Sequence, residues 1–398
     1  MAKNNNLTDF VVDIADAIRE KEGSTDKINP QDFHDRILAI KGAEETPIVE
    51  EKDVNFYDYD GTLLFSYTIE EAQALTELPT PPSHEGLVFD GWNWDYEDVI
   101  AFDYPMDIGA LYTTEDGSTR LFFNFLDDNS ELVLKLSKWS GNSLVVNWGD
   151  GNSETIVTTG QFSLTHIYVQ KGKYIVTIIS DADFSTDNQN IFGDILYNDN
   201  ARLALYSVFA GEKFYFANDA FCFSANLEYV AIPKRIGSFP NAVFDGCAKL
   251  KWVSLPQGVV LDKSFSNCGT IKVSLPKSAK LNTYVFQNCL SLTQIVLSDD
   301  ITTLGVGCYQ TCCNVRKFIA SKRLNSIGVI ALGNMSVCRI FDFRRCEQVP
   351  SLANVNALSN LNAQTIIVVP DSLYDAWVSA TNWSTYADKI VKSSEYTE

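Results

Sequence analysis

Histidine is scarce in this chain of 398 residues, which contains three: His34, His84 and His166. A zinc site wants histidine or further cysteine ligands at short spacing. A Ser/His/Asp or Cys/His catalytic set needs a histidine beside its nucleophile. Because all three histidines lie in the first half of the chain, we expect neither kind of site in the second half.

Cationic residues are also few: 31 Lys and Arg stand against 51 Asp and Glu, which gives a net charge of -20 and a pI near 4.5. Affinity for nucleic acid or for an anionic membrane begins with a cationic surface, so we expect neither partner. No run approaches the roughly 18 apolar residues of a membrane span. The polar start, Met1 to Asn6, lacks the apolar core of a secretory signal. We therefore expect no membrane insertion and no signal-directed export.

The composition favours β structure. A hydrophobic content of 45% excludes wholesale disorder, and 12% aromatic residues accompany short Val, Ile, Thr and Tyr runs. The length allows two to four domains. We predict a mainly β, multidomain protein with four parts: short helices in 1–42, a small β module in 43–116, a β-sandwich in 117–185 and a repeat solenoid in 186–398.

A bulky apolar residue returns every 21 to 23 residues in the C-terminal half, at Phe221, Phe244, Phe265, Phe286, Tyr309 and Leu332. Six residues after each comes a smaller apolar residue, and then a short alternation such as Val253-Ser254-Leu255 that predicts a strand. Each repeat is interpreted as one strand plus a tight non-strand return. Stacked repeats of this kind bury a continuous apolar column and usually serve binding.

The repeat pattern F-x-x-C-x-x-L-x-x-V-x-L-P resembles the BspA-type leucine-rich repeat over about residues 200 to 370. The family implies a surface or adhesion protein of bacteria, or a part of a phage. The third repeat is one residue short at Ile271, which predicts a local bulge or tightened turn. Ile366 to Pro370 and the helical spacing after it predict a terminal cap, with Asp371 as a helix N-cap.

Nine cysteines invite a metal or disulfide interpretation, but four of them share the third position after a repeat anchor: Cys247, Cys268, Cys289 and Cys312. Free cysteine behaves as a small buried hydrophobe, so these thiols are predicted to be structural. We expect no metal and no cofactor. An odd count and assembly in the cytoplasm also disfavour disulfides.

The N-terminal segment predicts two short amphipathic helices that are too small for a core of their own. Their apolar stripe contains Phe10, Ile14, Ile18, Phe33 and Ile37. The stretch from Leu7 to Phe33 resembles a segment that recurs in phage structural proteins of gut bacteria, which implies docking on other virion proteins or self-association, with a trimer favoured. The alternative is a helical hairpin that caps the next domain.

Asp58 to Leu63 matches the D-x-D-G-T-L signature of haloacid-dehalogenase-like phosphatases, in which the first Asp is the nucleophile and the second the general acid. The alternating runs on both sides of Asp60-Gly61 instead predict a β-hairpin, which we favour. The module continues to Trp92 and resembles internalin B-repeat-like spacers. Its Trp92, Trp94 and Tyr96 predict either a carbohydrate-stacking surface or a minimal core.

Trp148-Gly149-Asp150-Gly151, His166-x-Tyr168 and Gly172-x-Tyr174 resemble the PKD-type immunoglobulin-like sandwich. This resemblance implies a spacer or adhesion unit. His166 is interpreted as structural, and calcium at Asp150 stays open because one loop carboxylate does not make a calcium site.

Taken together, the resemblances imply a non-enzymatic structural component of a bacteriophage virion: a fibre or appendage made in the host cytoplasm, carried on the virion surface and bound to a bacterial surface protein or glycan. The expected lack of an export signal favours this over the first alternative, a bacterial cell-surface adhesin. The second alternative, a phosphatase-like hydrolase or a glycan depolymerase, lacks a recognisable catalytic set.

Overall fold

The computed structural model describes Ala15, Arg19, Ile28 and residues 52–187, 190–192, 199–269 and 272–397. The chain divides into two compact units, Met1–Glu50 and Glu51–Glu398. In the first unit Ala15 and Arg19 are helical. The predicted docking stripe lies outside the described residues: Phe10, Ile14, Ile18, Phe33 and Ile37.

The second unit is mainly β and begins with a small module. Its sheet has the strand order β2-β1-β4-β3, with α3 and α4 in its connections. The bounds are β1 (Val54–Tyr57), β2 (Leu63–Tyr67), α3 (Ile69–Gln73), β3 (Leu87–Trp92), α4 (Tyr96–Val99) and β4 (Met106–Thr114). The predicted hairpin is confirmed, because β1 and β2 pair antiparallel. Gly61 takes a φ of +87° in its turn, a conformation that favours glycine.

A two-sheet sandwich follows, and its two layers enclose an apolar core. One layer has the order β5-β10-β7-β8 and the other the order β11-β6-β9. The strands are β5 (Thr119–Phe125), β6 (Ser130–Lys138), β7 (Leu144–Asn147), β8 (Ser153–Ile156), β9 (Gly160–Tyr168), β10 (Gly172–Ser180) and β11 (Phe184–Thr186). Along β6 the inward residues Leu132, Leu134 and Leu136 are fully buried, as alternation requires.

One layer of the sandwich continues into the repeats, and the other layer ends at a short strand beside them. After α5 (Asp199–Ala204), β12 (Leu205–Phe209) pairs antiparallel with β5 and parallel with the first repeat strand, β14. On the other layer, β13 (Phe214–Tyr215) pairs parallel with β11. The sandwich therefore covers the end of the repeat stack, whose apolar column would otherwise meet water.

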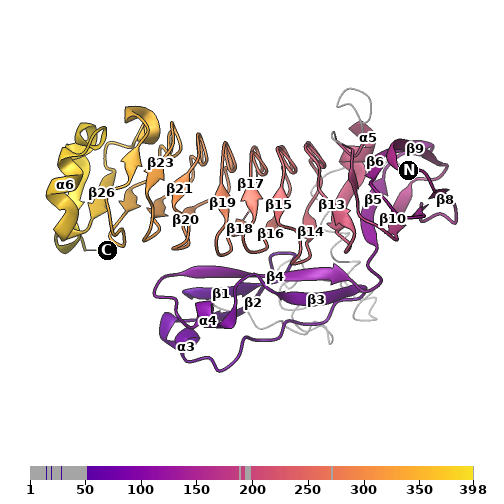
Figure 1. The fold of residues 1–398 in the computed structure, drawn as a ribbon, viewed down its shortest axis with the longest axis horizontal. Coiled ribbons are helices and arrows are strands. Elements are labelled where there is room, and N and C mark those ends of the chain that lie inside the picture. The colour runs from indigo at the N-terminus through magenta and orange to yellow at the C-terminus, as the bar shows by residue number, and fades with distance from the viewer. Residues whose placement is uncertain are drawn as a thin grey trace. The chain divides into compact units, whose positions relative to one another are not determined.

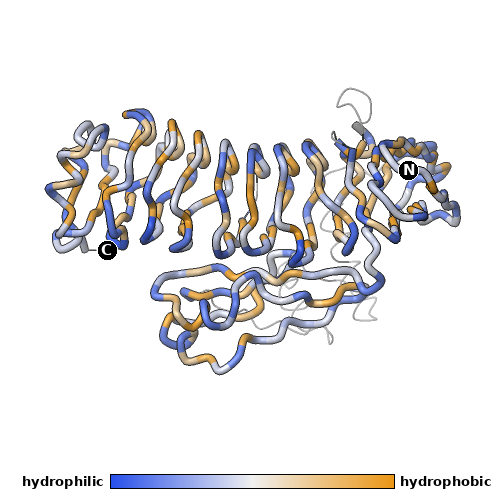
Figure 2. The backbone as a smooth tube through the Cα atoms, viewed as in Figure 1, coloured by the Kyte–Doolittle hydropathy of each residue, from blue (hydrophilic) through white to orange (hydrophobic). Residues whose placement is uncertain are grey.

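The repeats stack as two rows of parallel strands (Figure 1). The long row contains β14 (Tyr229–Ala231), β16 (Trp252–Ser254), β18 (Lys272–Ser274), β20 (Gln294–Val296), β22 (Lys317–Ile319) and β24 (Ile340–Asp342). The prediction of one strand per repeat was wrong, because each return contains a second strand of two residues: β15 (Ser238–Phe239), β17 (Val260–Leu261), β19 (Lys280–Leu281), β21 (Thr303–Leu304), β23 (Ser326–Ile327) and β25 (Ser351–Leu352). Hydrophobic segments recur in each coil (Figure 2).

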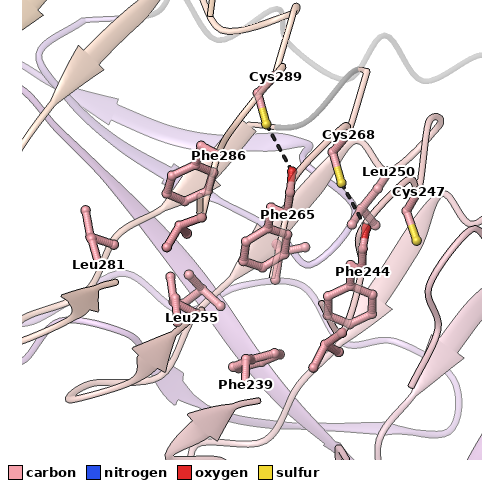
Figure 3. Packing of buried hydrophobic residues seen from close by; sticks show 14 of the residues in the cluster. Phe239, Phe244, Cys247, Leu250, Leu255, Phe265, Cys268, Leu281, Phe286 and Cys289 are labelled. Atoms are coloured by element: carbon pink, nitrogen blue, oxygen red, sulfur yellow. Dashed lines mark hydrogen bonds between the residues drawn. The ribbon is translucent and has the colours of Figure 1, made fainter. Parts of the chain in front are cut away.

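The aromatic anchors form one stack through the core (Figure 3). Ring centroids of successive anchors from Phe221 to Tyr309 lie 6.0, 5.7, 5.6 and 5.1 Å apart, with interplanar angles of 17° or less. Leu332 continues the column and is fully buried. Parallel strands hold each repeat in register with the next, so each ring meets its counterpart one repeat away.

A mixed cap closes the far end. It contains η2 (Val355–Leu358), β26 (Ile366–Val369), η3 (Asp371–Leu373), α6 (Tyr374–Ser379), η4 (Trp383–Lys389), β27 (Ile390–Lys392) and η5 (Ser393–Glu395). Trp377 and Trp383 are fully buried and pack on Phe343. The predicted N-cap role of Asp371 was wrong: this residue begins η3, and its carboxylate accepts hydrogen bonds from Ser393 and Ser394. Those bonds lower its pKa to about 2.

Candidate functional site

The six anchors of the repeats, from here on called the ladder residues, point into the core: Phe221, Phe244, Phe265, Phe286, Tyr309 and Leu332. Any ligand of the repeats must therefore meet outward side chains of the strands. The small module already lies on much of that face. Its longest strand, β4, is in contact with β14, β16 and β18 (Figure 1). The broad face that the repeats offer is therefore shared with another part of the same chain.

Small side chains make this close approach possible. The third residue of each long-row strand points outward, and in the first three repeats it is Ala231, Ser254 and Ser274. A Cβ atom added to Gly109 on β4 would lie 2.3 Å from the Oγ of Ser254. In the next two repeats the same position holds Val296 and Ile319.

Asn93 joins the module to two repeats at once. This fully buried residue donates through Nδ2 to the carbonyl oxygen of Leu255 (3.1 Å) and to the Oγ of Ser274 (2.8 Å). Its Oδ1 accepts from the backbone nitrogen of Gly109 (2.8 Å). Next to it, the Nε1 of Trp94 donates to the carbonyl oxygen of Leu275 (3.2 Å). Every polar atom of the Asn93 side chain is thus used, as a buried amide requires.

Aromatic and charged contacts extend the interface. The rings of Tyr57 and Trp252 lie 4.4 Å apart between centroids. Lys272 places its Nζ 4.3 Å from the Tyr57 ring and 3.2 Å from the carboxylate of Asp107. At the far end, Arg345 binds Asp103 and Asp299 at 2.7 Å each. Its guanidinium also lies 3.8 Å from the centroid of the Tyr104 ring.

A hollow of about 320 Å³ remains beside this interface. It lies where the long row is divided, because one sheet ends at β18 and another begins at β20. Its wall includes the ladder rings of Phe286 and Tyr309. Val273 and Leu292 are only partly buried there, although Val253 and Leu250, which occupy the equivalent positions in the second repeat, are fully buried. The predicted irregularity at Ile271 lies outside the described residues, but the short third repeat adjoins this division.

The rim of the hollow is polar and largely paired within the protein. Lys272 and Asp107 form the ion pair described above, and Asn55 donates to Asp107 at 3.3 Å. The floor is apolar, so the hollow could accept a small apolar group flanked by hydrogen-bonding atoms. No catalytic arrangement follows from these residues.

The phosphatase-like pair has structural roles. Asp58 is buried, accepts from the backbone nitrogen of Tyr59 (2.8 Å) and lies 2.7 Å from the Nε2 of His84. Asp60 accepts from the backbone nitrogen of Thr62 (2.9 Å) within the turn. Both carboxylates therefore hold the hairpin and its neighbouring loop.

The alternative of a carbohydrate-stacking surface at Trp92, Trp94 and Tyr96 was wrong, because both tryptophan rings are buried and serve as core. Tyr96 is partly buried, and its hydroxyl donates to the carbonyl oxygen of Leu75 at 2.9 Å. His166 stacks on Trp148 at 4.8 Å and places its Nε2 2.7 Å from the Oδ2 of Asp150. Asp150 also accepts from the backbone and side chain of Asn152. Burial opposes ionisation of Asp150, but these hydrogen bonds prevail and lower its pKa.

The four cysteines at the third position after a repeat anchor, from here on called the slot cysteines, form a second row beside the rings: Cys247, Cys268, Cys289 and Cys312. Each thiol donates to the carbonyl oxygen of the anchor one repeat earlier, at 3.0 to 3.3 Å. Figure 3 shows the bonds from Cys268 to Phe244 and from Cys289 to Phe265. All nine cysteines are free thiols. Within the described ranges, no three His, Cys, Asp or Glu side chains gather as a metal site. In that same part of the chain, no helix is long and apolar enough to cross a membrane.

Three solved structures are similar to part of this chain at low identity. The T. pallidum leucine-rich repeat protein TpLRR is 18% identical with a TM-score of 0.31, and the match covers 49% of this chain and 86% of that one. A leucine-rich cell surface protein of Faecalibacterium prausnitzii A2-165 is 15% identical (TM-score 0.29; 47% and 59% covered). A leucine-rich repeat protein of Bacteroides ovatus ATCC 8483 is 17% identical (TM-score 0.26; 41% and 56% covered). The match thus spans less than two thirds of the last two proteins.

No curated protein matches the chain. Residues 215–364 match the family model of the BspA type leucine rich repeat region in six copies, so this part of the chain consists of BspA-type leucine-rich repeats.

Proposed function

We propose that this protein is a non-enzymatic structural component of a bacteriophage virion, a fibre or appendage that attaches to the bacterial surface. The observation that carries the proposal is the continuity of the second unit. One sheet runs without a break from the sandwich into the first three long-row strands of the repeats, and the small module is fixed along the same strands. Such a body presents surfaces in fixed positions, which suits attachment better than turnover.

The residues with catalytic potential support the same view. Asp58, Asp60 and His84 hold a turn and a loop, and the thiols of the four slot cysteines bind backbone carbonyls. Burial also raises the pKa of the Cys312 thiol to about 12, which removes the thiolate that nucleophilic chemistry needs.

In this proposal residues 1–42 bind other virion proteins or copies of the same chain, with a trimer favoured. Short amphipathic helices gain most of their stability from packing an apolar face, here the stripe that contains Phe10, Ile14 and Ile18. Light scattering of the full chain and of its Ile14→Asp/Ile18→Asp variant tests this. A trimer that the substitutions dissociate supports self-association, and a monomeric wild type leaves docking on a partner as the role of the segment.

Localisation in intact particles tests the virion assignment. Antibody against the full chain should label purified virions, and mass spectrometry should find the chain in them at a constant ratio to the capsid protein. Recovery only in the envelope of uninfected bacteria would replace the virion assignment with the adhesin alternative. Turnover of phosphate monoesters that is lost in Asp58→Asn would instead favour the hydrolase.

A further inference from the structure

A hollow of about 270 Å³ lies where the outer face of the sandwich meets the first repeats, and residues of both parts line it. Its strand residues belong to the sheet with the order β13-β11-β6-β9, at the end of the sandwich that adjoins the repeats. One row of paired residues crosses all four strands there: Gln161 pairs with Ser137, Ser137 with Ser185, and Ser185 with Tyr215. Because paired residues project on the same side of a sheet, these four side chains line one groove.

Polar groups without protein partners face this groove. Ser185 is 5% exposed, and its hydroxyl makes no hydrogen bond to another described residue. The hydroxyl of Ser137 likewise has no partner among the residues that the structure describes. Neighbouring strands lie about 4.8 Å apart, so the two hydroxyls are separated by roughly the width of one sugar ring. Neither hydroxyl oxygen is among the buried unpaired atoms of the described residues, so both are open to the groove and can bond a polar ligand or water.

Two aromatic rings form the other wall. Trp139 is 55% exposed, whereas the other six of the seven tryptophans are at most 4% exposed. Its ring lies 5.4 Å from that of Tyr215 at an angle of 40°. Arg235 holds Tyr215 from the protein side, with its guanidinium 4.6 Å from the ring centroid and Nη2 bonded to the carbonyl oxygens of Gly211 and Phe214. One ring is therefore fixed and the other is open to solvent.

We propose that this groove binds a neutral oligosaccharide. The C–H face of a sugar ring packs on an exposed aromatic ring, while its hydroxyls need donors and acceptors such as Ser137, Ser185 and Gln161. The hydrogen-bonding groups that line the groove belong to side chains on a sheet face, which suits the hydroxyls of a sugar better than the backbone of an extended peptide that adds to a sheet. Asp187 accepts a hydrogen bond from Gln161 at the rim, and the net charge is -20, so an acidic glycan is disfavoured.

The proposal rests on the proposed function, because it supplies the chemistry by which the chain would hold a bacterial surface. Because Trp139 is the one exposed tryptophan, the quenching of its fluorescence reports binding in the groove. Short neutral oligosaccharides of glucose, galactose, mannose, rhamnose and N-acetylglucosamine are titrated into the full chain while acrylamide quenching of tryptophan fluorescence is followed. At least one sugar should protect Trp139 in a saturable manner, with a dissociation constant on the order of 1 mM or tighter.

Variants distinguish binding in this groove from nonspecific binding. Trp139→Ala removes the reporter, so saturation-transfer NMR measures binding in all variants. Trp139→Ala and Tyr215→Ala should each weaken binding at least about tenfold. Ile167→Ala is the matched control, because Ile167 is also exposed on the outer face of β9 but lies at the opposite end of the strand, and it should bind as the wild type does. Absence of binding to every sugar, or binding that survives both aromatic substitutions, would overturn the proposal.

Binding of labelled full chain to gut bacterial isolates distinguishes the two proposals. If the wild type and Trp139→Ala bind cells equally, the groove is not the attachment site and the proposed function stands. If the wild type binds a sugar but no cells, the groove proposal stands and the attachment function fails.

Discussion

Gly109 of the small module lies so close to Ser254 of the second repeat that a Cβ atom on residue 109 would stand 2.3 Å from the Ser254 Oγ and 2.6 Å from its Cβ. The Cα of Ser254 is 3.1 Å away, so the backbone leaves little room to adjust. This contact fixes how near β4 can approach the repeats.

We therefore expect Gly109→Ala to destabilise the docked module by about 1–3 kcal/mol, the usual cost of overpacking. Urea unfolding and hydrogen exchange of β4 measure the change. Gly237→Ala is the control, because no atom lies within 4 Å of the Cβ position there. Adding Ser254→Gly to Gly109→Ala should restore part of the lost stability, and a double variant no more stable than the single one would contradict the steric explanation.

A second prediction concerns Arg345, which holds the other end of the docked module. Arg345→Ala removes two ion pairs and the stacking on Tyr104, so hydrogen exchange should rise in the segment 98–106. The loss of stability should be modest, about 1–2 kcal/mol, because the partner Asp103 is largely exposed and solvent screens that pair.

Arg345→Lys is the informative companion. Lysine keeps the charge but cannot lay a planar guanidinium on the Tyr104 ring. Exchange in the segment 98–106 should therefore resemble that of Arg345→Ala more than that of the wild type. Full protection by lysine would show that charge alone holds this end.

The periodic positions were the predictable part of this molecule. The rings of Phe244 and Phe265 stack because each repeat places a ring at the same position. The stack and the slot cysteines therefore recur at a fixed spacing, and that spacing alone identified them. The Asp60-Gly61 turn was equally local, because turn residues and alternating strands determine a hairpin without help from distant segments.

Docking of the small module could not be predicted from periodicity. Ser254 and Ser274 fit the repeat pattern as ordinary outward residues, and their meaning depends on β4, more than a hundred residues earlier. A signal was present, since Ala231, Ser254 and Ser274 are small where later repeats carry Val296 and Ile319. The groove at Trp139 was also missed, because its row joins four strands that the sequence separates.

Alkaline pH should destabilise the repeats. Burial raises the pKa of Cys222, Cys312, Cys338 and Cys346 to about 12, from an ordinary value near 9. Above pH 9 the unfolded chain loses these protons while the folded chain keeps them, so stability is fully present below pH 9 and falls as the pH rises toward 12. The free energy of unfolding, measured in urea between pH 7 and pH 11, should decline above pH 9.

Cys312 tests this pH dependence, and the adjacent Cys313 is its control. Cys312 is fully buried and Cys313 is partly exposed. Cys312→Ala should make the decline shallower, by up to about 1.4 kcal/mol per pH unit. Cys313 should also be the thiol that reacts first with a disulfide reagent in the folded protein, and Cys313→Ala should abolish that fast phase.

Removal of two different rings from the aromatic stack should reduce the stability of the protein by different amounts. Phe244 has stacked rings on both sides and a buried surrounding, so Phe244→Ala leaves a closed cavity and should cost about 3–5 kcal/mol. Phe286 is also stacked on both sides, but its ring lines the hollow between β18 and β20. Solvent or neighbouring side chains can fill the space that Phe286→Ala leaves, so we expect a smaller loss. Urea unfolding of both variants measures the difference, and equal losses would mean that the hollow does not reach the core.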